Sequence, residues 1–131
     1  MAGLSQGGGV GLAMANWITS GDPGFDVWGM DVSRFGDWTT PGYTLTKVIE
    51  NYSRRFKISF PNEELPAGRP LHTSPIFNKL TEANAVWGSA YGLEYPLWFQ
   101  ETGKTPIEEV TFKRSNAFPA VAEEVRGVRE N

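Results

Sequence analysis

A run of glycines near the start of the chain is the first feature that could do chemistry. Gly7, Gly8, Gly9 and Gly11 lead directly into a segment whose apolar residues recur at helical spacing. Backbone N–H groups at the N-terminus of such a helix can hold an anion or an electron-rich carbonyl. The spacing is neither the dinucleotide fingerprint G-x-G-x-x-G nor a phosphate-binding loop. A flexible tail is the alternative, and only the helix that follows favours a ligand contact.

The proline-rich loop at residues 61–75 contains the chain's one histidine, an arginine and two glutamates. A catalytic His72 would need a carboxylate held beside it, and no spacing supplies one, so we expect an ordinary surface or packed residue. We expect Arg69 to anchor the loop to a carboxylate or carbonyl elsewhere in the fold. Glu63 and Glu64, being adjacent, are expected to be solvated. No catalytic residue is therefore predicted.

Aromatic residues are dense in the second half of the chain. Packing in the core or against another domain is favoured over a ligand-binding platform for this group, which comprises Trp87, Tyr91, Tyr95, Trp98 and Phe99. Such a surface, if left bare, would promote self-association.

Composition excludes several classes of site. The chain has no cysteine and one histidine, which rules out disulfides, thiolate chemistry and cysteine-based or multi-histidine metal sites. A net charge of -3 with scattered basic residues argues against nucleic acid as a partner. Neither a signal peptide nor a run of about twenty apolar residues is present, so we expect a soluble protein that is not secreted and does not enter membranes.

Periodicity and breaker residues predict an α+β fold, with three to four helices packed on short, mostly antiparallel strands. Helices are expected over about residues 9–20 and 42–56, with a short helical turn within 30–35. Two further helices are expected to be capped by Ser74 and Asn116. Asn84 is placed to end the third helix in a left-handed conformation. Strands are expected at residues 57–60, 85–88, 95–99 and 107–112.

Short motifs follow one another along the chain in a specific order. They are Gly-Gly-Val-Gly at 8–11, Ala-Asn-Trp-Ile at 15–18, Gly-Asp-Pro at 21–23, Asp-Val-Trp at 26–28, Asp-Val-Ser-Arg-Phe at 31–35, Ala-Gly-Arg-Pro-Leu at 67–71, Thr-Ser-Pro at 73–75, Asn-Ala-Val-Trp-Gly at 84–88 and Gly-Leu-Glu-Tyr-Pro-Leu-Trp-Phe at 92–99. This series resembles the FAD-dependent dimethylglycine and sarcosine dehydrogenase family. The resemblance covers nearly the whole chain.

The resemblance implies a fragment of a larger multidomain enzyme. Residues 1–21 would be the C-terminal edge of the FAD-dependent oxidoreductase domain, 22–100 the central domain, and 101–131 a linker with the first helix of a folate-binding domain similar to the glycine-cleavage T protein. The intact enzyme would demethylate N-methyl amines oxidatively, using FAD and passing the one-carbon unit to tetrahydrofolate. The resemblance would also place Gly8, Gly9, Val10 and Gly11 beside the isoalloxazine ring of the flavin. A location in the cytoplasm or mitochondrial matrix follows.

The family's dinucleotide fingerprint, covalent flavin attachment site and folate-binding carboxylate have no counterpart in this sequence. We therefore expect the isolated chain to be inactive, with the remainder of the flavin and folate domains as its partners in cis or in trans. The rival hypothesis is a non-catalytic subunit or interaction module that docks on a separate flavoprotein. A third is a stand-alone ligand-binding domain built on the aromatic residues.

Overall fold

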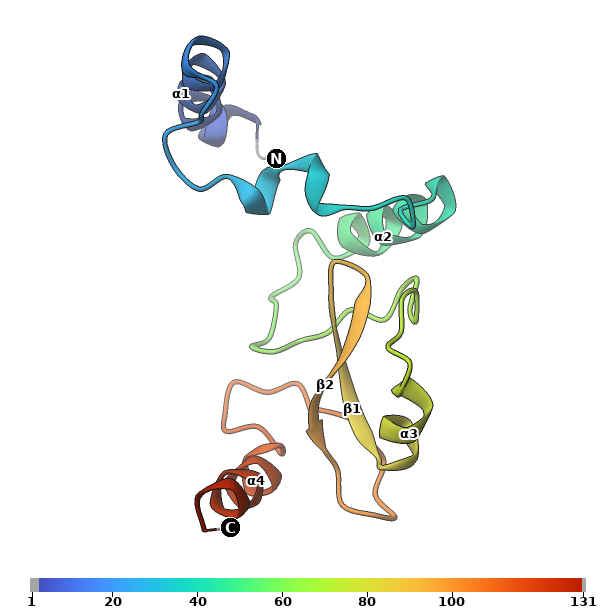
Figure 1. Ribbon diagram of the computed structural model, residues 1–131. Helices are drawn as coiled ribbons and strands as arrows, with labels where there is room; N and C mark the ends of the chain where they lie inside the picture. The colour runs from blue at the N-terminus through green and yellow to red at the C-terminus, as the bar shows by residue number, and fades with distance from the viewer. Residues whose placement is uncertain (1–2, 131) are drawn as a thin grey trace. The chain divides into compact units, whose positions relative to one another are not determined.

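The computed structural model describes residues 3–130, and the chain divides into two units, with the boundary between Gly36 and Asp37. The predicted α+β class is confirmed: the described residues contain four α-helices and one two-stranded antiparallel sheet (Figure 1). No helix among these residues is long and apolar enough to cross a membrane. Each unit is described by itself below.

The first unit consists of helix α1 (Gly3–Ser20) and a connection with two 3-10 turns, η1 (Trp28–Met30) and η2 (Val32–Arg34). The helix ends where predicted, at Gly21, whose φ of 75° fits a left-handed stop. It begins six residues earlier than predicted, because glycine weakens a helix without removing the N–H group that the helix needs. The predicted turn at 30–35 is realised as the two 3-10 turns.

Aspartate side chains order the connection of the first unit. The Asp22 carboxylate accepts from the backbone N–H of Gly24 at 2.6 Å, and the Asp26 carboxylate accepts from the N–H of Trp28 at 2.9 Å. Short polar side chains that accept from the backbone two residues ahead stabilise turns. The acidic residues here therefore hold local conformation.

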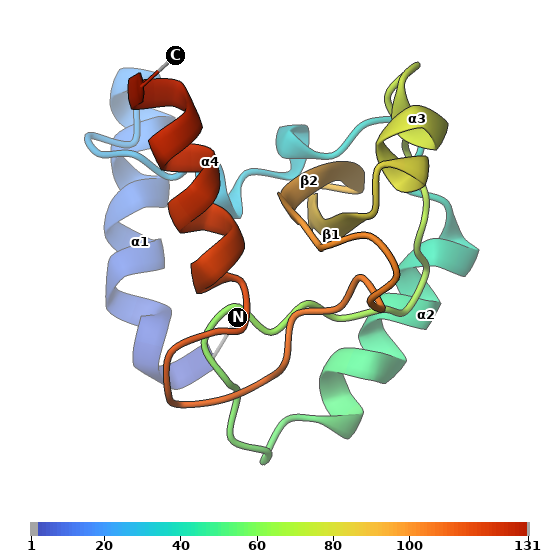
Figure 2. The same ribbon diagram turned by 90° about the horizontal axis from the view of Figure 1, so that it is seen from below.

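The second unit is built around a hairpin of strands β1 (Ala85–Ala90) and β2 (Leu93–Phe99), with a bulge at Val86 and Trp87. Its turn at Tyr91 and Gly92 has positive φ at both residues, 48° and 80°, as a tight two-residue hairpin requires. In Figure 1 the turn points toward helix α2 (Pro41–Ser53). Figure 2 shows helices α3 (Phe77–Glu82) and α4 (Phe118–Glu130) on opposite sides of the hairpin.

The core of the second unit is small. Trp98 and Val86 of the hairpin are buried against Ala117, which immediately precedes α4. On the other side Phe77 of α3 lies against Trp87, with ring centroids 4.3 Å apart. The core therefore lies between α4 and the hairpin, while α3 covers the opposite side.

Two predicted strands and two predicted caps are wrong. Residues 57–60 and 107–112 meet through the Phe60 and Phe112 rings, with centroids 4.6 Å apart, and both segments are irregular. Pro61 and Pro106 border these segments, and proline cannot donate to a strand ladder. The third helix is capped by Ile76 without a side-chain bond, so Ser74 is no N-cap.

Asn116 lies outside α4, which begins at Phe118. Its side-chain oxygen accepts from Glu109 N–H and its amide donates to the Ile107 carbonyl, both at 3.0 Å. The Ser115 hydroxyl accepts from Ala117 N–H near the helix start, at 3.0 Å. The side chain predicted to cap the helix is used to hold the preceding loop.

Candidate functional site

The four residues predicted to contact a cofactor occupy neighbouring positions on α1. Gly8, Gly9, Val10 and Gly11 lie beyond its first turn, where helical hydrogen bonds use the backbone N–H groups. A Cβ added at any of the three glycines would meet no atom within 4 Å among the described residues. Nothing in the described packing requires glycine there, although each costs the helix about 1 kcal/mol relative to alanine.

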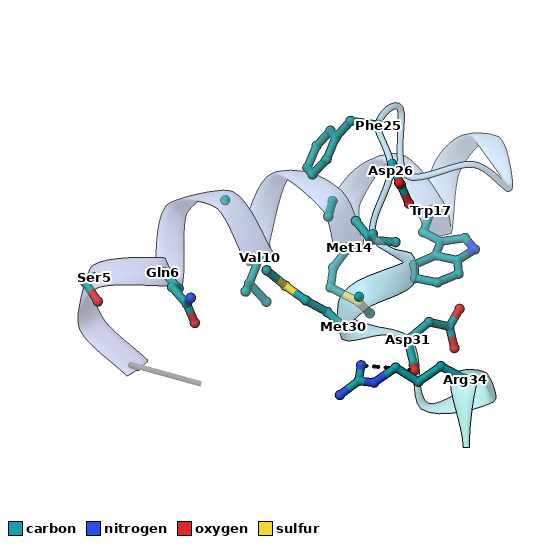
Figure 3. A pocket seen from close by; sticks show the side chains of 14 residues that line it. Ser5, Gln6, Val10, Met14, Trp17, Phe25, Asp26, Met30, Asp31 and Arg34 are labelled. Atoms are coloured by element: carbon teal, nitrogen blue, oxygen red, sulfur yellow. Dashed lines mark hydrogen bonds between the residues drawn. The ribbon is translucent and has the colours of Figure 1, made fainter. Parts of the chain in front are cut away.

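A hollow of about 700 Å³ lies beside this helix within the first unit. Its walls are mainly apolar: Val10, Met14 and Trp17 come from α1, and Met30 comes from η1. Figure 3 shows the Val10 and Met30 side chains approaching one another across it. Gly9 and Val10 therefore border the hollow, whereas Gly8 and Gly11 do not. Its size is within the range of small-molecule sites.

Charged groups lie at one edge of the hollow. The Arg34 guanidinium donates to the Asp31 carbonyl at 3.2 Å and lies 4.5 Å from the centre of the Phe35 ring. The Asp31 carboxylate accepts from the backbone N–H and hydroxyl of Ser33, which hold the pKa of Asp31 below its ordinary value of 3.8. This carboxylate is therefore ionised at neutral pH and is poorly suited to act as a general acid.

The lining of the hollow is mainly apolar, and the described residues provide no acid-base pair within it. The described part of the chain also contains no group of three residues suited to hold a metal ion. Sequence reasoning missed Met30 and Arg34 as borders of the hollow. The only sequence indication was Asp31-Val32-Ser33, a pattern typical of a side-chain-capped turn.

Arg69 fulfils its predicted role as an anchor. Its Nε and Nη2 donate to the carboxylate of Glu94 on β2 at 2.9 and 2.6 Å, and its Nη1 donates to Glu64 at 3.2 Å. Glu94 is 4% exposed, so this ion pair is buried. The hydrogen bond that Arg69 donates to Glu94, together with the charge of that carboxylate, raises the pKa of Arg69 despite burial. The pair fastens residues 61–75 to the hairpin.

His72 is exposed and packs edge-on to the Trp38 ring, with centroids 5.5 Å apart. Its backbone bonds to β2 on both sides, donating to Gly92 O and accepting from Glu94 N–H at 2.9 Å each. The expectation of an ordinary packed or surface residue is confirmed. Trp38 also covers Gly92, where an added Cβ would lie 2.6 Å from the ring.

The two adjacent glutamates are not simply solvated, which corrects the prediction. Glu63 forms an ion pair with Arg54 at the end of α2, and its side chain is 15% exposed. Glu64 pairs with Arg69 and accepts from the N–H of Ser89 at 3.3 Å. Both carboxylates join the loop to other elements, which their spacing in the sequence could not indicate.

The aromatic residues of the hairpin do not form one ligand-binding surface. Trp98 faces α4 and Trp87 packs on Phe77 of α3, while Tyr91 lies at the turn and is half exposed. The Trp98 indole donates to Glu108 at 3.3 Å. Packing is therefore the main role of these rings.

Comparison with known proteins connects the chain to flavoenzymes. Residues 20–74 match the family described as FAD dependent oxidoreductase central domain. The chain is 36% identical to human mitochondrial dimethylglycine dehydrogenase over 98% of its length, and 33% identical to human mitochondrial sarcosine dehydrogenase over 85%. It is 32% identical, over 98% of its length, to the mouse mitochondrial pyruvate dehydrogenase phosphatase regulatory subunit. The chain spans about 15%, 12% and 15% of these relatives, respectively.

Proposed function

We propose that this chain, which belongs to the family of FAD-dependent dimethylglycine and sarcosine dehydrogenases, serves as a connecting piece of an enzyme that oxidatively demethylates N-methyl amines. The observation that carries the proposal is similarity along 98% of the chain to a protein about seven times longer. The proposed organisation is a flavin domain ending near residue 21, a central domain over 22–100, and a folate-binding domain starting within 101–131.

Within that enzyme, the glycine side of α1 would form one wall of the flavin site. The glycines leave this surface free of side chains, which allows a planar ring to approach the backbone closely. Donation from their N–H groups requires the helix to begin at Gly8 in the flavin-bound protein. This would unwind residues 3–7, the first turn of the helix, and two of these five residues, Gly3 and Gly7, are glycines, the weakest helix former after proline. Such donors would stabilise negative charge on a reduced ring.

The residues present fit an edge of a flavin but not a whole dinucleotide. The hollow beside Gly9 and Val10 is apolar and open, yet the described chain has no glycine fingerprint to hold a pyrophosphate. FAD, when bound, supplies the hydride acceptor for amine oxidation. The side chains of this piece would exclude water and position the ring, so the isolated chain is expected to be inactive. Tetrahydrofolate would accept the one-carbon unit at a site elsewhere.

FAD titration tests the proposed wall. The chain alone, and the polypeptide extended through the preceding sequence of its gene, are titrated with FAD and followed by flavin fluorescence. We expect binding only by the extended polypeptide. The Gly9→Leu substitution should weaken that binding at least tenfold, because the side chain would occupy the space of the ring. Gly127→Leu is the matched control, since Gly127 is also helical with nothing within 4 Å.

Tight binding of FAD by the chain alone would contradict the proposal, because a self-contained flavin module would then exist. Equal affinity for FAD in the Gly9→Leu and Gly127→Leu variants would show that α1 does not form a wall of the flavin site. Either result leaves the family relationship unchanged, so the two parts of the proposal can fail separately.

A non-catalytic role is the second candidate function. It is favoured by the likeness to the pyruvate dehydrogenase phosphatase regulatory subunit, whose name describes regulation and not oxidation. In that case the extended polypeptide could bind FAD, but no N-methyl amine would reduce it. Anaerobic mixing with dimethylglycine or sarcosine distinguishes the two roles.

A further inference from the structure

Helix α2 is oriented the opposite way from an ordinary amphipathic surface helix. Its polar face, formed by Lys47, Glu50 and, just beyond the helix, Arg54, is turned toward the loop of residues 61–75 in the same unit. The Lys47 ammonium donates to Leu65 O at 3.1 Å, and the Glu50 carboxylate accepts from Ala67 N–H at 2.9 Å. Arg54 pairs with Glu63. These contacts fix the rotation of the helix about its axis.

The apolar face of α2 points away from those contacts. At 100° per residue, it lies about 180° from the polar face. Its side chains are 45–95% exposed, comprising Leu45, Val48, Ile49, Tyr52 and, just beyond the helix, Phe56. An apolar face of this length on a helix marks an interaction site, because amphipathic helices are normally stabilised by burying it.

We infer that this face is the docking surface for the flavin-binding part of the longer polypeptide. The five side chains expose roughly 500 Å² between them, estimated from typical side-chain areas. Two copies meeting through this face alone would bury on the order of 1,000 Å², less than a stable interface between separate proteins needs. An interface of this size is sufficient between domains of one chain, whose tether replaces diffusional association.

Charge at the rim of the face also argues against a second copy. Arg55 lies 5.9 Å from the Tyr52 ring centre and 5.7 Å from that of Phe56, and Lys57 follows. In an antiparallel pair of copies, these cations would lie opposite the first turn of α2 of the other copy, and that turn contains no acidic residue. The complementary surface should therefore be apolar with a carboxylate at its edge. In the sequence, α2 begins five residues after the first unit, which bears the proposed flavin wall.

The inference rests on the proposed function, which supplies the occupant, and cysteine labelling tests it. The chain has no cysteine, so Ile49→Cys introduces a single thiol on the face. Lys104→Cys is the control, because Lys104, like Ile49, is largely exposed to solvent. Maleimide labelling rates are measured by peptide mass spectrometry in the chain alone and in the extended, FAD-loaded polypeptide.

We expect the Ile49→Cys and Lys104→Cys variants to label at similar rates in the chain alone, and Ile49→Cys to label at least tenfold more slowly in the FAD-loaded polypeptide. Unchanged labelling of Ile49→Cys in a polypeptide that binds FAD would overturn the docking surface while leaving the proposed function intact. Failure of the extended polypeptide to bind FAD would instead refute the proposed function, and the assigned occupant with it. Protection in the chain alone that grows with its concentration would show that a second copy covers the face, which also contradicts the inference.

Discussion

Removing the buried carboxylate of Glu94 should destabilise the second unit severely. The substitution Glu94→Gln keeps the size of the side chain but leaves the Arg69 guanidinium without its buried counter-charge. Breaking a buried ion pair on one side typically costs about 3–5 kcal/mol. Arg69 retains Glu64, whose side chain is 35% exposed, and the glutamine oxygen still accepts one hydrogen bond. We therefore expect a loss of about 2–3 kcal/mol in the free energy of unfolding.

Urea unfolding followed by circular dichroism measures this loss, which corresponds to a midpoint shift of about 1 M or more at typical slopes. Glu123→Gln is the control, because Glu123 forms an exposed ion pair with Arg126 and should contribute less than about 0.5 kcal/mol. In a double-mutant cycle with Arg69→Met, the two sites should be coupled by more than about 1 kcal/mol. Equal effects of Glu94→Gln and Glu123→Gln, or no coupling, would refute the assignment of this pair as the anchor of residues 61–75.

Three further perturbations follow from the same unit. Asn84 has φ 68°, and its side-chain amide donates to three carbonyls. Asn84→Gly removes these hydrogen bonds and should lower the free energy of unfolding by about 1–2 kcal/mol, measured in urea. Asn84→Ala should lower it by about 1 kcal/mol more, because alanine also disfavours positive φ. Gly92→Ala should lower the free energy of unfolding by about 2–4 kcal/mol, because Gly92 has positive φ and an added Cβ would overlap the Trp38 ring. The control Gly103→Ala should lower it by about 1–2 kcal/mol, because Gly103 has positive φ but open space around it. Equal losses would show that the overlap with Trp38 contributes nothing. Burial is the main cause that raises the pKa of Tyr43 above 10.0, and the nearby Glu94 carboxylate adds to it. Ultraviolet titration should therefore show that Tyr43 ionises above pH 10. The stability from its neutral phenol is present below pH 10 and is lost as pH rises through the folded pKa; a pKa at or below 10.0 would contradict this.

The sequence allowed some of these features to be predicted because they depend on local chemistry. Asn84 was expected in the left-handed region, and its φ is 68°. Arg69 was expected to find a carboxylate, because a guanidinium in a loop needs a planar acceptor. Its partner Glu94 could not be predicted, since the contact depends on how residues 61–75 lie against the hairpin.

The orientation of α2 shows a different limit. At helical spacing, Leu45 and Tyr52 share one face of the helix, and Lys47 and Glu50 lie on the other. This spacing alone does not show which face contacts the rest of the unit, because that depends on carbonyl and N–H groups of a distant loop. The two predicted strands failed for a related reason, since alternating residues form a strand only where a partner backbone is in register.

Reduction of bound flavin by an N-methyl amine tests the central claim most directly. The extended polypeptide is loaded with FAD, mixed with dimethylglycine or sarcosine without oxygen, and followed by the visible absorbance of the flavin. The proposed function predicts bleaching that depends on amine concentration and that the chain of residues 1–131 alone does not show. A flavin-loaded polypeptide that no methylated amine reduces would contradict it and favour the regulatory role.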